Sequence, residues 1–289
     1  MEETINLTDI IFNSLNELFS KLFSSIDNSI YSLLDDITFI TPDLLINNSF
    51  NKIIGTSRNN GILLICNSLV FGFILYYSIN YLISHLTYSR IDSPKQFVFK
   101  SIIFIAIMNS SIWICEQIIN LISIITDGLS YLCYSLFTSE LSFSEFIDDI
   151  NQTLSISGDF NLFSFDGIVK SFTSFGLINL IFNNSLRYIM IQIFILISPF
   201  AFLSLITNST EWFFRVWLKN FISLLLVQVL TALVLLLSFS ISPSSNPLFS
   251  KLLYIGIIFA LSKVNHFMKE LFGGISTVVR TNLSEIHEK

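Results

Sequence analysis

The chain has 289 residues and a net charge of −6; 52% of its residues are hydrophobic and only 12% are charged. Soluble domains carry about 25% charged residues. This composition, with a mean hydropathy of +0.70, therefore excludes a soluble domain and indicates a polytopic membrane protein. We expect an all-α fold, because the apolar runs are continuous and lack the alternation with a period of two that barrel strands require.

Residues 4–38 carry apolar side chains at spacings of three and four, which predicts one amphipathic helix. The opposite face is polar, so this helix is expected to lie in the interface or to pack on partner helices rather than to cross the membrane. Few Lys and Arg side chains accompany it, which favours a protein partner over an anionic lipid surface. We assign residues 1–60 to an extracytoplasmic N-terminal segment. Within it, Thr41-Pro42-Asp43 predicts a helix break.

Five later runs have about the 20 apolar residues that a helix needs to cross a hydrocarbon core of about 30 Å. Two of them form a first pair within residues 61–126, and three lie within residues 184–268. Lys251, Lys263, Asn265 and His266 crowd the ends of the last one. The five predicted spans are 62–82, 97–119, 188–206, 221–241 and 248–267.

Between these two groups, residues 127–183 form an acidic extracytoplasmic loop. Short apolar pieces in it predict small helices at 129–137 and 141–150, and a further helix at 168–182 leads into the third span. Lys and Arg concentrate in the loop between spans one and two, in the turn between spans three and four, and in the tail 269–289. Cationic short loops face the cytoplasm, so we expect the N-terminus outside and the C-terminus inside.

Spans three and four form a hairpin around which the rest of the chain is placed. Its turn contains Glu211, Arg215 and Lys219, with Trp212 and Trp217 as expected anchors at the membrane interface. Pro199 lies near the middle of span three, where its missing N–H and its ring bend a helix. A neighbouring group is expected to satisfy the carbonyl that this proline frees.

Charged and amide side chains inside the spans are the remaining candidates for a functional site. Glu116 lies near the outer end of span two and Arg187 opens span three on the same side, so an ion pair is predicted; a proton or ion relay is the functional alternative. Gln228 and Asn109 lie in mid-span, where such amides either join neighbouring helices or line a pore. Trp113 is expected to lie in the core.

Enzyme signatures are absent from the sequence. His85, His266 and His287 are scattered, and Cys66, Cys115 and Cys133 lack the spacing of a metal site or a disulfide framework. We therefore predict no enzymatic activity, no cofactor and no metal. A phosphate-binding glycine loop and a basic aromatic platform for nucleic acid are also missing.

The hairpin resembles a known family. Ser198-Pro199-Phe200-Ala201, followed by residues 217–224 with the sequence WLKNFISL and by Gln228, is similar to the TrbL-like polytopic inner-membrane subunits of type IV secretion and conjugation systems. The resemblance covers about residues 185–270. It implies an N-out, five-span protein of the bacterial cytoplasmic membrane with a central extracytoplasmic loop, which residues 127–170 would provide.

The resemblance further implies a channel or scaffold subunit for transfer of DNA or protein. Its expected partners are membrane lipid, secretion ATPases, envelope subunits and further copies of the same chain in a homo-oligomer. Structural or channel candidates are then Glu116, Arg187, Pro199, Trp217, Lys219 and Gln228. Two other classes stay open from the residues alone: a transporter or permease subunit, and a holin-like pore-forming protein.

Overall fold

The computed structural model describes residues 28–46, 48–55, 61–87, 93–154, 165–240 and 247–272, together with Ser14. Every regular element in these ranges is helical, which confirms the all-α class. The helices are α2 (Asn28–Thr38), α3 (Pro42–Leu45), α4 (Asn48–Ile54), α5 (Ile62–Thr87), α6 (Pro94–Asn109), α7 (Ser111–Phe137), α8 (Phe143–Leu154), α9 (Phe165–Leu203), α10 (Glu211–Phe239) and α11 (Pro247–Phe272).

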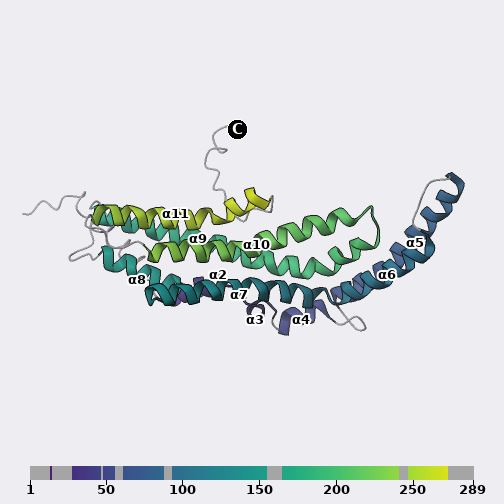
Figure 1. Ribbon diagram of the computed structural model, residues 1–289, viewed down its shortest axis with the longest axis horizontal. Coiled ribbons are helices and arrows are strands. Elements are labelled where there is room, and N and C mark those ends of the chain that lie inside the picture. Colours follow the sequence, from purple (N-terminus) through teal and green to yellow (C-terminus); the bar gives the residue numbers. More distant parts are fainter. Residues whose placement is uncertain are drawn as a thin grey trace, which may run out of the picture.

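Helix α10 lies at the centre of an elongated bundle, in contact with α7, α9 and α11 (Figure 1). The short helix α2 packs against α8 and α9, and α8 also contacts α10 and α11. The α5–α6 pair projects from the bundle at the end opposite to α8. Buried apolar side chains form one large cluster around the α9–α10 hairpin and another around α8.

Four helices in the described ranges are long and apolar enough to cross a membrane, one fewer than the five spans predicted. They are α5, α7, α9 with the 3₁₀ turn that follows it, and α10. The polytopic helical class is therefore confirmed. Helix α11 covers the predicted fifth span as one continuous helix, but Lys251, Lys263 and Lys269 interrupt its apolar surface.

The second span was predicted as one helix over 97–119, and this prediction is wrong. Helix α6 ends at Asn109, and Ser110 both caps α6 and precedes α7. With 16 residues, α6 is about 24 Å long, which is less than a hydrocarbon core of about 30 Å. The long apolar helix is instead α7, which continues to Phe137 and so includes the small helix expected at 129–137.

Helix α9 joins two helices that were predicted separately. It has 39 residues and is about 58 Å long, so it runs through both the predicted helix at 168–182 and the third span. The polar residues between these two apolar runs lie within the helix and do not end it. Of the predicted N-terminal amphipathic helix, only 28–38 falls in a described range, where it forms α2; the rest, apart from Ser14, and the tail after 272 lie outside the described residues.

Candidate functional site

A stripe of polar side chains on α9 faces the N-terminal segment. Asn184, Arg187, Tyr188 and Gln192 are spaced three, four and eight residues from the first. Residues with this spacing share one face of an α-helix. Together with Gln228 on α10 we call these residues the polar seam.

The polar seam binds the backbone of residues 37–46, where the chain passes from α2 into α3. The Arg187 guanidinium donates from Nη2 to the carbonyls of Ile37 and Thr38, at 3.2 and 2.5 Å. The Tyr188 hydroxyl donates to the Leu44 carbonyl at 2.7 Å, and Gln192 Nε2 donates to the Leu45 carbonyl at 3.3 Å. Asn184 Nδ2 donates to the Thr38 hydroxyl at 2.9 Å. Irregular backbone buried within a bundle needs such partners.

Gln228 connects three parts of the chain. Its Oε1 accepts a hydrogen bond from the Ile40 amide at 3.1 Å, and its Nε2 donates to the Thr126 hydroxyl of α7 at 3.2 Å. The side chain is buried, with 2% of its surface exposed. Of the two roles considered for this residue, helix packing or pore lining, its two bonds therefore fit helix packing.

Arg187 is fully buried and lies at the C-terminal end of α2. The last carbonyls of a helix carry a partial negative charge and have no partner within the helix, which explains why a guanidinium is held there. The predicted ion pair with Glu116 is wrong: Glu116 is half-buried on α7 and makes no hydrogen bond or ion pair with any other described residue. Arg187 Nε and Nη1 have no hydrogen-bond partner in the described part of the chain.

A second contact attaches α2 to α8. Asp35 Oδ1 accepts a hydrogen bond from the amide of Phe143, the first residue of α8, at 2.8 Å. Burial raises the pKa of the Asp35 carboxyl to about 6, while its bonds to the amides of Phe143 and Ser144 act in the opposite direction. Helix α2 is thus fixed by two contacts. Arg187 of α9 binds the carbonyls at its C-terminus, and its own Asp35 accepts a hydrogen bond from the N-terminus of α8.

The backbone carbonyl that Pro199 leaves without a donor in α9 has a local partner. Pro199 cannot donate to the Ile195 carbonyl four residues earlier, and the Ser198 hydroxyl donates to that carbonyl at 2.7 Å instead. One residue earlier, the Phe194 carbonyl accepts a hydrogen bond from Trp217 Nε1 at 2.9 Å. The freed carbonyl is therefore met by the residue adjacent to the proline.

Trp217 was predicted to be an interface anchor, and this prediction is wrong, because only 3% of its surface is exposed. Its ring lies 5.3 Å from that of Phe221 and 5.5 Å from that of Phe202. Trp212 is 63% exposed and matches an anchor better. Trp113 was expected in the core but is 62% exposed on α7.

Charged residues near the α9–α10 turn remain on the surface. Lys219 is exposed, and Arg215 forms an ion pair with Glu211 at 2.8 Å. Lys100 of α6 donates to the Asn208 side chain in the turn at 2.6 Å. Basic residues of α6 and of the start of α10 therefore both lie close to the α9–α10 turn.

Asn109 lies at the end of α6 and pairs with Asn67 of α5. Each amide donates to the carbonyl oxygen of the other, at 3.1 and 3.3 Å. The pair joins the two helices that project from the bundle. Asn109 therefore has a partner on a neighbouring helix.

Sequence reasoning identified Arg187 and Gln228 but missed Asp35, Asn184, Tyr188 and Gln192. The signal was present, because polar residues recur at helical spacing through an otherwise apolar run of α9. Within the described ranges, no group of three or more His, Cys, Asp or Glu side chains is placed to hold a metal ion. The polar seam consists mainly of donors to backbone carbonyls, so its chemistry is to fix a chain segment.

Comparison of the chain with known proteins adds no family. No family model, curated protein or solved structure matches it.

Proposed function

We propose that the chain is a channel or scaffold subunit of a type IV secretion complex that transfers DNA or protein across the bacterial cytoplasmic membrane, without enzymatic activity. The proposal depends on the resemblance of residues 185–270 to the TrbL-like subunits. One observation supports it most: Trp217, in the WLKNFISL run, donates to the Phe194 carbonyl one helical turn before the Ser198-Pro199 step, and so joins the two helices of the hairpin that carries the resemblance.

The distribution of basic residues supports the proposed orientation. Lys100 contacts Asn208, so the basic start of α6 and the basic α9–α10 turn lie next to each other, at the same end of the molecule. The acidic helix α8 lies toward the opposite end of α9 (Figure 1). We accordingly propose a cytoplasmic turn and C-terminus, with α8 and the N-terminus outside. Labelling of cysteines introduced at position 148, an exposed residue of α8, and at position 285 tests this orientation, and reaction of both from the same compartment would contradict it.

Exposed apolar surface supports assembly with other subunits. Only 17% of the most apolar window of α5 is buried within the chain, so this helix offers its surface to lipid or to neighbouring proteins. Expected neighbours are further copies of the chain, secretion ATPases and envelope subunits. Affinity purification from crosslinked membranes, followed by mass spectrometry, tests whether these proteins are recovered together.

The deciding experiment measures DNA transfer from cells that naturally carry the gene. We expect in-frame deletion to reduce transfer to background without stopping growth, and the wild-type gene to restore it. Trp217→Ala should restore transfer poorly at an equal protein level, whereas the exposed control Trp212→Ala should restore it fully. Normal transfer from the deletion strain would refute the proposal.

A second experiment tests the role of the N-terminal segment. Removing residues 1–27 leaves the whole of α2 and the segment bound by the polar seam, so the bundle itself should still form. If the N-terminal segment binds other subunits, this deletion abolishes transfer while the protein stays in the membrane.

Lysis of cells on controlled expression of the intact chain would instead indicate a holin-like pore.

A further inference from the structure

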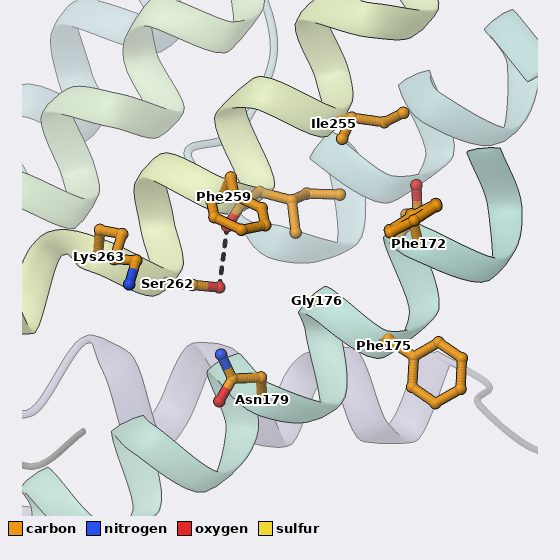
Figure 2. A pocket seen from close by; sticks show the side chains of 10 residues that line it. Phe172, Phe175, Gly176, Asn179, Ile255, Phe259, Ser262 and Lys263 are labelled. Atoms are coloured by element: carbon orange, nitrogen blue, oxygen red, sulfur yellow. Dashed lines mark hydrogen bonds between the residues drawn. The ribbon is translucent and has the colours of Figure 1, made fainter. Parts of the chain in front are cut away.

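A groove of about 250 Å³ lies between α9 and α11, away from the polar seam (Figure 2). Gly176 of α9 and Ile258 of α11 both line it and are in close contact. A Cβ atom at Gly176 would lie only 2.3 Å from Ile258 Cγ2, so a larger residue there would force the Ile258 side chain to move. The α9 wall consists of residues 172–179, on the N-terminal side of the most apolar part of that helix.

The two ends of the groove differ in chemistry. Phe172, Phe175 and Ile255 lie at one end, whereas Asn179, Ser262 and Lys263 lie at the other (Figure 2). Both phenylalanines are well exposed. A ligand that fits this arrangement has an apolar body and a polar head.

Two donors are available at the polar end. Asn179 Oδ1 accepts a hydrogen bond from Asn183 Nδ2 at 3.3 Å, which leaves the amide Nδ2 of Asn179 directed toward the groove, as Figure 2 shows. Lys263 is exposed and forms no ion pair with any described residue. The nearby carboxylate on the same helix, Glu270, is instead paired with His266 at 3.1 Å.

We infer that this groove binds one anionic phospholipid, with its phosphate between Lys263 and Asn179 and an acyl chain along Phe172 and Phe175. Charge complementarity selects this occupant, because an uncompensated ammonium group beside an apolar wall attracts an anion attached to a hydrocarbon chain. The membrane in which the bundle is embedded supplies such molecules. This inference is independent of the proposed secretion function.

The test titrates phosphatidylglycerol, with phosphatidylcholine as the neutral comparison, into the purified full-length protein and counts bound lipids by native mass spectrometry. We expect phosphatidylglycerol to bind more tightly. Lys263→Gln should weaken it about fivefold, the effect of one basic residue near an anionic headgroup. Lys269→Gln is the matched control, because it removes the same charge from an exposed position of α11 outside the groove, and it should leave binding unchanged.

A further variant separates the groove from general charge attraction. Ser262→Phe keeps Lys263 but fills the groove, so it should also remove the preference for phosphatidylglycerol. Equal binding of the two lipids, or equal effects of Lys263→Gln and Lys269→Gln, would overturn the inference. Dimers crosslinked through Phe259→Cys in native membranes would show that a second copy occupies the groove, which would overturn it as well.

Discussion

Helices α5 and α10 are similarly apolar but have different surroundings. Their most apolar windows have mean hydropathies of 2.1 and 2.6, yet 17% of the first and 56% of the second is buried within the chain. Several of their polar side chains also differ in the partners that they bond to. Ser68 and Ser78 of α5 donate to carbonyls of their own helix, whereas Gln228 of α10 bonds to α7 and to the N-terminal segment.

This comparison shows that a high hydropathy indicates only that a helix can lie in lipid. Whether the helix lies in the core of the bundle is indicated better by the hydrogen-bond partners of its polar side chains. A serine bonded to its own turn needs no neighbour. A glutamine cannot be satisfied in the same way, so it needs a second element within reach. Substitutions in the two helices should therefore have different costs.

The largest effect is expected at the polar seam. Gln228→Leu leaves the Ile40 amide buried without an acceptor and removes the bond to Thr126, so it should lower the free energy of unfolding by about 2–3 kcal/mol. Ser68→Ala on α5 is the control, and its effect should stay within about 0.5 kcal/mol. Unfolding by sodium dodecyl sulfate in mixed micelles measures both variants. Equal, small effects would show that buried polar contacts do not distinguish the two helices.

A smaller effect is expected where Trp217 contacts α9. Trp217→Phe keeps an aromatic ring against Phe202 and Phe221 but removes the donor to the Phe194 carbonyl. The loss should be about 1–1.5 kcal/mol, measured by the same titration. Trp212→Phe, at an exposed position, should change little. A loss as large for Trp212 as for Trp217 would contradict the assignment of Trp217 to the hairpin core.

A pH dependence is expected from Asp35. Its pKa is about 6 in the folded protein and near 3.8 when exposed, so the folded state holds the proton more tightly. Stability is then highest below pH 3.8 and falls as the pH rises toward 6. Asp35→Asn keeps an acceptor for the Phe143 amide without a buried charge, so it should be more stable than the wild type at neutral pH.

The control for this pH dependence is Asp36→Asn. Asp36 is exposed and only adds a like charge that raises the pKa of Asp35, so most of the dependence should persist in this variant. Asp149 of α8 contributes in the same direction, because burial and then the charges of Glu145 and Asp148 raise its pKa. The Asp35→Asn profile should therefore be flatter, with a residual slope. An unchanged profile would contradict the role given to Asp35.

The smallest effect is expected between α5 and α6. A double-mutant cycle with Asn67→Leu and Asn109→Leu should give a coupling energy of about 0.6 kcal/mol, typical of polar contacts between membrane helices. Refolded protein in lipid bicelles suits this measurement. A coupling as large as the effect of Gln228→Leu would show that the projecting pair is held as firmly as the bundle.

The sequence predicted the helical membrane class, the α9–α10 hairpin and the break at Pro42, which begins α3. These follow from local properties: apolar length and the restricted backbone of proline. The boundary at Ser110 was not predicted, and the boundary predicted near Asn183 is absent from the structure. A polar cluster ends α6 at the first place, whereas at the second a similar cluster stays helical, because Asn184 and Arg187 bond to a distant segment.

The candidate site was only partly predictable for the same reason. Arg187 and Gln228 stood out as polar residues among apolar ones, but both bond to backbone groups of residues 37–40. Every residue other than proline has the same backbone carbonyl and amide, so the sequence does not show which of these groups a polar side chain will bond to. The burial of Trp217 was missed because an aromatic residue near a turn fits an interface anchor and a hairpin core equally well.

The long-range bonds of residues 37–46 also constrain how the protein is made. Ile40 and its acceptor on Gln228 are separated by 188 positions. At about 5–20 residues per second, a ribosome needs roughly 10–40 s to synthesise that interval. The N-terminal segment therefore leaves the ribosome well before Gln228 is synthesised, and until then the Ile40 amide bonds to water or to another partner.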